Sequence, residues 1–178
     1  EPVFAEIASV SKDNSDANLL EAAFDRQALE NLYKNAPEIL KPQMRIKIDL
    51  ANLRILARAP KQANGAKLVS IASVSFGTVS RDEIIALFGK GDDAIAATLK
   101  NRIPFAAKFP DVGQMEIEME NAFLRGVRRT SADVFGPGPA ISYFISRFNE
   151  ARNVRAVLLG KQSNLEPEII RALLRFAD

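Results

Sequence analysis

The sequence predicts an all-α fold in which one helical unit is used twice. Apolar residues recur at the helical spacing i, i+4, i+7, as at Ile46, Leu50 and Leu53. Two distant segments, Asp49–Leu56 and Glu150–Val157, share the order acid, two residues, Asn, aliphatic, Arg, any residue, aliphatic. Such recurrence is typical of a supersecondary unit that occurs more than once. With apolar residues at 47% of 178, the chain can build a globular core.

Further matches flank both motif segments. Upstream of each lies Ala-Phe with a nearby Arg, and downstream of each lies Glu-Ile-Ile. The matched residues are Ala23, Phe24 and Arg26 with Ala122, Phe123 and Arg125, and Glu83–Ile85 with Glu168–Ile170.

The first half begins with a helix that carries Leu20 and Phe24 on its apolar face. Pro37 and Pro42 interrupt it, because proline lacks a backbone N–H and clashes with the preceding turn. A long and largely buried helix follows over residues 43–60.

Residues 61–78 are ambiguous, because their Val, Ile and Ser content also allows a short strand. A helix followed by a loop suits the helical context better. Ser80 and Glu83 then form a capping box, the Ser hydroxyl and Glu carboxylate each accepting from a free amide at a helix start. Another short helix is expected over residues 93–100.

Prolines at 104 and 110 bracket the boundary between two helical units, residues 1–104 and 105–178. Asp111 with Gln114 resembles a second capping arrangement, followed by an apolar stripe through Met115 and Met119. After the Gly-Pro-Gly-Pro break at 136–139, a second long helix carries the later motif. Gly160 is expected to end that helix in a left-handed conformation, and Pro167 to start the last one.

The composition excludes several chemistries. The chain has no Cys and no His, so thiol nucleophiles, Cys/His zinc sites and imidazole acid–base catalysis are ruled out. Gly89-Lys90-Gly91 lacks the glycine spacing of a phosphate-binding loop and is interpreted as a surface turn. No apolar run approaches the ~20 residues of a membrane-spanning helix. We therefore expect no cofactor, no metal and no small-molecule substrate.

The two motifs supply the main candidate residues. On a helix the acid and the Asn lie three positions apart and share a face, whereas the Arg two residues further points elsewhere. A buried Asn needs hydrogen-bond partners, so we expect polar clamps that tie each motif helix to its neighbours. The Arg residues are expected to reach acids on other helices. The motif residues are Asp49, Asn52, Arg54, Glu150, Asn153 and Arg155.

Charged residues between the motifs are interpreted as helix surface. Glu116, Glu118 and Glu120 could in principle bind a metal, but residues two apart do not share a helix face, and a solvated face is favoured. Arg125 and Arg128, with the adjacent Arg129, complement the helix dipole near a C-terminus. An acidic partner or nucleic acid is the less favoured interpretation of these arginines, although they remain candidate interface residues.

Taken together, these features resemble the C subunit of the archaeal and bacterial V/A-type rotary ATPases, which corresponds to the d subunit of the eukaryotic V-type enzyme. The resemblance rests on the order and duplication of the motifs, on DLANLRILARA, and on the C-terminal run from Ile141 to Leu174. Members of that family have three such units, whereas two are recognised here. We therefore expect a fragment or a short natural member, with residues 1–16 as a remnant of a preceding unit.

The resemblance implies a non-catalytic coupling protein at the cytoplasmic face of the membrane. Its expected partners are the D and F proteins of the central stalk and the membrane proteolipid ring. The alternative is a mildly basic all-helical module that binds nucleic acid or acts as a scaffold, supported by the net charge of +2 and a sequence pI ≈ 9.0. A helical enzyme with an unrecognised carboxylate site has the least support. We expect no enzymatic activity and no nucleic-acid partner.

Overall fold

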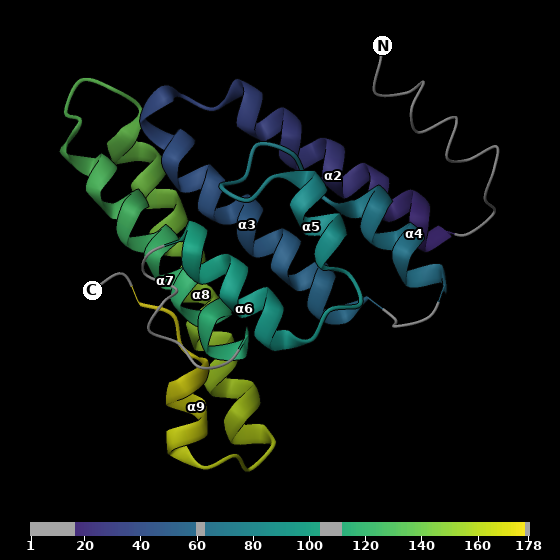
Figure 1. Cartoon of the computed structure of the whole chain (residues 1–178). Coiled ribbons are helices and arrows are strands. Elements are labelled where there is room, and N and C mark those ends of the chain that lie inside the picture. Colours follow the sequence, from purple (N-terminus) through teal and green to yellow (C-terminus); the bar gives the residue numbers. More distant parts are fainter. Residues whose placement is uncertain (1–16, 60–62, 104–111, 177–178) are drawn as a thin grey trace.

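The computed structural model describes residues 17–59, 63–103 and 112–176. Every regular element in these ranges is helical, which confirms the predicted all-α class (Figure 1). Two short 3₁₀ turns, Glu38–Leu40 and Thr130–Ala132, precede the second helix of each half. The α-helices are α2 (Ala17–Asn35), α3 (Lys41–Arg58), α4 (Ala63–Ala72), α5 (Arg81–Leu87), α6 (Asp92–Arg102), α7 (Val112–Arg129), α8 (Gly138–Gln162) and α9 (Pro167–Leu173).

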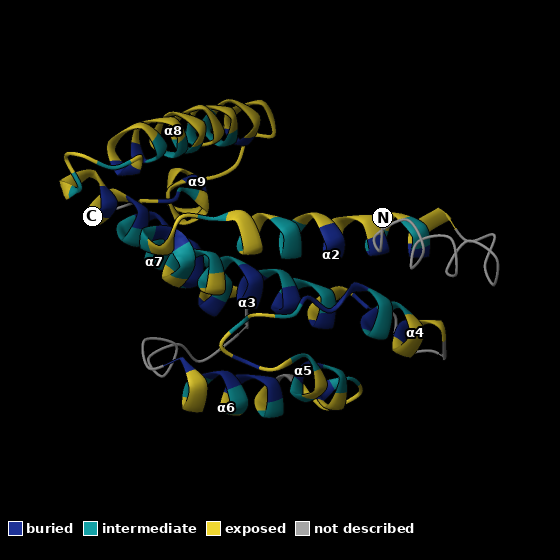
Figure 2. Cartoon of the chain, turned by 90° about the horizontal axis from the view of Figure 1, so that it is seen from above, coloured by how far each residue is buried: buried dark blue, intermediate teal, exposed yellow. Residues whose placement is uncertain are grey.

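Helix α3 is the centre of the molecule and contacts α2, α4, α5 and α7. Figure 2 shows α5 and α6 as a layer on one side of α3, with α2 on the other. The side chains between these layers are aliphatic or Met, and burying them supplies the main stabilising free energy. The core members are Leu50, Leu53, Leu56, Ala59, Val69, Val79, Ile84, Leu87, Ile95, Ala96, Leu99, Ile103, Met115 and Met119.

Helix α8 has a different environment from α3, although both carry the motif. It packs on α7, and α9 folds back against its C-terminal half (Figure 1). In this 25-residue helix the buried residues are Gly138, Ser142 and Gly160. Figure 2 shows the rest of α8 as largely exposed. The long helix of the second half therefore presents an exposed surface where the long helix of the first half is covered.

Several local predictions are confirmed. Within the ambiguous stretch, residues 63–72 form helix α4, and a loop follows it. The capping box is present at α5, where Glu83 N donates to Ser80 Oγ and Ser80 N donates to Glu83 Oε2. Helix α6 covers the short helix expected there, and Pro167 lies in the first turn of α9.

The expected role of Gly160 is wrong. Helix α8 continues two residues beyond it, and Asn164 has the left-handed backbone, with φ of 53°. Gly160 is buried because Ile170 of α9 packs on it: a Cβ at this position would lie 2.6 Å from Ile170 Cγ1. The glycine is therefore required for the close approach of α9 rather than for a helix end.

No helix among the described residues is long and apolar enough to cross a membrane. The capping arrangement expected at Asp111 and the unit boundary between residues 104 and 105 lie outside the described ranges. The division into two units stays a prediction.

Candidate functional site

Asn52 of α3 holds the backbone of Val74. The Asn52 side chain is fully buried. Its Nδ2 donates to Val74 O at 3.0 Å, and Val74 N donates to Asn52 Oδ1 at 2.8 Å. A carboxamide has one donor group and one acceptor, so it satisfies both backbone polar groups of a single residue. The segment that follows α4 is thereby fixed to the middle of α3.

Asn153 of α8 makes the same contact with Arg175. Its Nδ2 donates to Arg175 O at 2.8 Å, and Arg175 N donates to Asn153 Oδ1 at 3.0 Å. In both halves the held residue lies 22 positions after the asparagine. Asn149, one turn earlier on α8, also donates to Arg175 O, at 2.9 Å. The structure therefore places both motif asparagines at the same kind of contact, between a long helix and the segment that leaves a shorter one.

These contacts indicate which helices of the two halves correspond, and this correspondence differs from the one that the Glu-Ile-Ile match suggests. Each held residue comes just after a short helix, which is α4 in the first half and α9 in the second. Val69 of α4 and Ile170 of α9 are the buried residues at matching distances before the held residue. The Glu-Ile-Ile match would instead pair α5 with α9. The asparagine contacts favour pairing α4 with α9, because α5 follows the held segment, and a three-residue match is too short to fix a register.

The acids of the two motifs lie in different surroundings. Asp49 is buried and accepts hydrogen bonds from the backbone N–H groups of Thr78, at 2.8 Å, and Val79, at 3.1 Å. Burial raises the pKa of Asp49, and the hydrogen bonds from Thr78 and Val79 only partly oppose this rise. Glu150 is exposed and accepts from Arg147 of its own helix at 2.5 Å. Asp49 thus orders a loop, whereas Glu150 makes a surface ion pair.

Arg54 joins the two halves of the chain. Its Nε donates to Glu116 Oε1 and its Nη2 to Glu120 Oε1, both at 2.7 Å. Glu116 and Glu120 lie one turn apart on α7, so a single guanidinium spans both carboxylates. This agrees with the expectation that the motif Arg reaches acids on another helix.

Glu120 is the centre of a larger cluster. Arg152 of α8 donates to both of its carboxylate oxygens, at 2.9 and 2.7 Å, and Arg175 Nε donates at 2.5 Å. Together with Arg54, three guanidinium groups surround one carboxylate that is 3% exposed. Burial alone would raise the pKa of Glu120, but the hydrogen bonds from the three arginines outweigh it and lower the pKa to about 2.

The interpretation of residues 116–120 as a solvated face is therefore wrong for Glu120. A signal was available in the sequence: Glu116 and Glu120 each follow a methionine of the apolar stripe, Met115 or Met119, and so lie beside the buried face. The two arginines from the second half carried no such signal. Neither belongs to the shared motif positions, and their roles depend on how α8 and α9 are placed.

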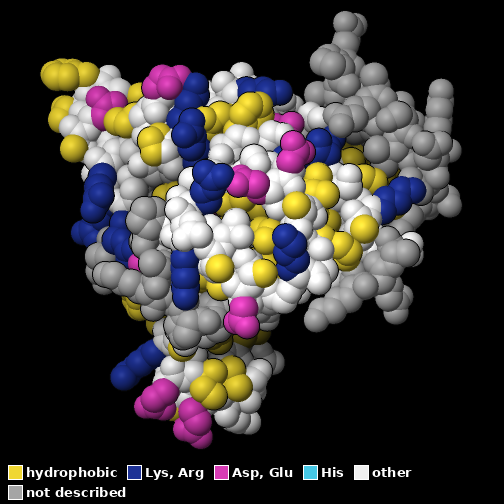
Figure 3. All heavy atoms as spheres, viewed as in Figure 1, with side chains coloured by type: hydrophobic (Ala, Val, Ile, Leu, Met, Phe, Trp, Pro, Cys, Tyr) yellow, Lys and Arg dark blue, Asp and Glu magenta, His cyan; other side chains and the backbone are white. Residues whose placement is uncertain are grey.

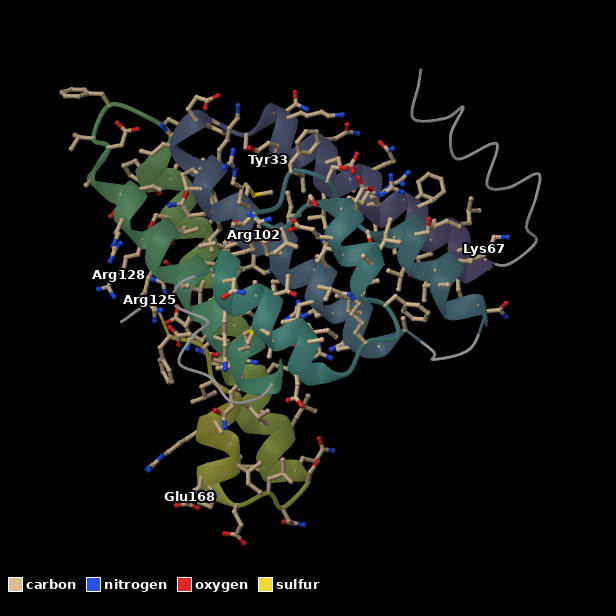
Figure 4. The ribbon with its side chains drawn as sticks, in the orientation of Figure 1. Tyr33, Lys67, Arg102, Arg125, Arg128 and Glu168 are labelled. Atoms are coloured by element: carbon tan, nitrogen blue, oxygen red, sulfur yellow. The ribbon has the colours of Figure 1, made fainter. Side chains whose placement is uncertain are left out.

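The remaining predicted residues lie at the surface of α7 and α8. Arg125 pairs with Glu118 of its own helix, and Arg128 is exposed. Figure 4 shows both side chains pointing outward from one edge of α7, and Figure 3 shows basic side chains at that edge. Arg155 is exposed on α8 and makes no hydrogen bond or ion pair within the described part of the chain. The structure therefore brings Arg54 into a buried cluster but leaves its counterpart Arg155 at the surface.

The charged cluster around Glu120 is suited to a structural role rather than to catalysis. A carboxylate held by three guanidinium groups stays ionised and has no proton to transfer at neutral pH. Within the described ranges no three Asp or Glu side chains lie close enough together to hold a metal. An open groove of about 900 Å³ lies between α7, α8 and residues 174–176, and its lining is mainly apolar. The cluster therefore joins α3, α7 and α8, and an open apolar groove lies beside it.

A comparison with known families identifies the family of this chain. A model described as ATP synthase (C/AC39) subunit matches residues 1–173. The chain belongs to this family. The resemblance to the C subunit of the V/A-type rotary ATPases is thereby confirmed.

One curated relative shows how similar the chain is to a family member and how much of that member's length it covers. The chain is 24% identical to the C subunit of the A-type ATP synthase of Methanocaldococcus jannaschii over 172 residues, which cover 86% of this chain and 43% of that protein. The chain therefore spans less than half the length of this curated relative. No solved structure matches the chain.

Proposed function

We propose that this chain is a non-catalytic coupling component of a V/A-type rotary ATPase. In this role it connects the central rotor stalk, through its D and F proteins, to the proteolipid ring, and it lies peripherally at the cytoplasmic face of the membrane. The observation that carries the proposal is the match to the ATP synthase (C/AC39) subunit family over residues 1–173.

The stiffness of the fold supports this role. Torque passes through a protein only if its helices resist sliding past one another, and close-packed interiors transmit strain well. Glu120 ties α7 to α3 and α8 through Arg54 and Arg152, and Arg175 adds the segment after α9. The two asparagines add fixed points along α3 and α8. The buried cluster therefore lies where both halves meet.

Two arginines at the outer edge of α7, the exposed Arg128 and the half-exposed Arg125, are the proposed partner contacts. Arg125 and Arg128 lie outside the buried cluster and point away from the helices (Figure 4). Their charge favours a partner surface with acidic side chains. Mutating charges at the edge of an interface mainly lowers the association rate and alters its salt dependence.

The test is co-purification with the D and F stalk proteins of the same organism, by size exclusion at near-physiological salt. We expect a complex with the wild-type chain and a weaker one with the double variant Arg125→Glu/Arg128→Glu. Lys161→Glu/Arg171→Glu, which reverses two exposed charges away from α7, is the matched control and should bind like wild type. Absence of a complex both for this chain and for a full-length relative would contradict the proposal. Salt-sensitive binding to oligonucleotides would then favour the nucleic-acid alternative.

A further inference from the structure

The exposed face of α8 is equivalent to the face of α3 that α7 covers. The asparagine contacts align the two helices with an offset of 101 residues, since Asn52 corresponds to Asn153 and Val74 to Arg175. Arg54, two residues after the first asparagine, then corresponds to Arg155. This alignment identifies the residues of α8 that occupy the positions contacting α7 in the first half.

In the first half, α3 meets α7 along one line of side chains. Gln43 packs on Gly126, where a Cβ would lie 2.7 Å from Gln43 Cγ. The Lys47 ammonium lies 5.3 Å from the ring centre of Phe123. Arg54 completes the line with its ion pairs to Glu116 and Glu120.

The equivalent line on α8 is exposed. Phe144 and Phe148 replace Gln43 and Lys47, and their side chains are 67% and 82% exposed. Ala151 and Arg155 continue the line, and both are exposed. Figure 2 shows this helix at the edge of the molecule, with no described helix on its outer side. Two exposed phenylalanines beside Arg155 form an apolar strip with a cationic end.

We propose that this strip, Phe144, Phe148, Ala151 and Arg155, docks an amphipathic helix of a partner that presents carboxylates four residues apart. The chemistry follows from α7, whose Glu116 and Glu120 hold Arg54 at the equivalent position. The two phenylalanines add large apolar area where the first half has Gln and Lys, so the partner should carry apolar side chains along the same edge. The inference rests on the internal equivalence and not on the proposed coupling role.

The positive charge of Arg155 requires carboxylates on the partner helix. Arg155 becomes desolvated when a helix covers it, and an unpaired buried guanidinium is unfavourable. A neutral or basic helix therefore fits the strip poorly. In the first half the pairing is bidentate across two acids, and the same geometry is expected at Arg155.

The experiment uses a labelled peptide of residues 112–129, the sequence of α7, and the whole chain as receptor, with binding followed by fluorescence anisotropy. We expect saturable binding with a Kd below about 1 mM, and at least a roughly tenfold loss for Arg155→Glu and for Phe148→Asp. The matched control is Arg171→Glu, which reverses an exposed charge on α9 outside the strip. Changing both Glu116 and Glu120 to Gln in the peptide should weaken binding to the wild-type chain to a similar degree.

Thermal unfolding of each variant separates binding from folding, because Arg155 and Phe148 are exposed and their changes should leave Tm unaltered. Absence of binding up to about 1 mM, or binding that neither variant weakens, would overturn the proposal. The second of these results would mean that the peptide replaces α7 on α3. Self-association of the chain that Arg155→Glu abolishes would also overturn it, since a second copy would then be the occupant.

Discussion

Asn52 and Asn153 make the same two hydrogen bonds, each to both backbone polar groups of the residue 22 positions further along the chain. Each asparagine lies in a long helix and fixes the non-helical segment that follows a shorter one. The contact recurs although the held residues, Val74 and Arg175, have nothing in common as side chains. This recurrence supports the proposal that one helical unit is used twice.

Removing the first asparagine contact should destabilise the fold. In Asn52→Leu the N–H and C=O of Val74 lose their partners in a buried site, so we expect a loss of about 1–3 kcal/mol in the free energy of unfolding. Asn153→Leu should cost less, because its surroundings are half-buried and water can replace the amide. The exposed Asn101→Leu is the control and should lie within about 0.5 kcal/mol of wild type in urea denaturation. Unchanged stability of Asn52→Leu would refute the clamp.

The buried carboxylate of Glu120 should be the most sensitive single position. Glu120→Gln leaves three guanidinium groups without their shared anion, and breaking a buried ion pair costs about 3–5 kcal/mol. The control is Glu118→Gln, whose ion pair with Arg125 is half-exposed and worth at most about 1 kcal/mol. Calorimetric Tm values for the two variants provide the comparison. Equal effects would mean that the cluster contributes no more than a surface pair.

The same residue predicts a pH dependence. The folded-state pKa of Glu120 is lowered to about 2 from an ordinary value of 4.5. Its contribution to stability is therefore fully present above about pH 4.5 and is lost as the pH falls toward 2. Between these values the stability of wild type should fall more steeply than that of Glu120→Gln. Parallel pH profiles of the free energy of unfolding would contradict this.

The two motif acids should respond differently to removal. Asp49→Ala leaves the N–H groups of Thr78 and Val79 without an acceptor, so we expect a loss of about 1–3 kcal/mol. Glu150→Ala removes a surface pair with Arg147 and should change stability by less than about 1 kcal/mol. Chemical denaturation of both variants measures the difference. Similar losses in the two variants would show that the acid of the shared motif contributes equally to stability whether it is buried or exposed.

Local spacing was enough to predict the helices and the capping box, because helical periodicity and capping depend on residues close in sequence. The need of a buried Asn for hydrogen-bond partners was also enough to expect that the motif asparagines tie their helices to neighbouring segments. The sequence does not predict that Val74 is the residue whose backbone Asn52 binds. That residue is chosen by how α4 turns back on α3, which is a tertiary effect.

The charged cluster shows the same limit. Arg152 and Arg175 come from α8 and from the segment after α9, and only the packing of α7 on both long helices brings them to Glu120. Gly160 illustrates the opposite error: its place near a helix end predicts a terminator, whereas the packing of Ile170 requires its lack of a side chain. Backbone freedom and close approach both select glycine, and sequence alone does not distinguish them.

Reconstitution is the strongest test of the proposed role, in which the chain couples rotation to ion transport without catalysing ATP hydrolysis. Membranes bearing the V/A-type ATPase of the same organism would be assayed for ATP hydrolysis and for ATP-driven ion transport, with this protein present and with it removed. We predict that removal abolishes transport while hydrolysis by the catalytic head persists, and that adding the protein back restores transport. Transport that continues in its absence would rule out the coupling role.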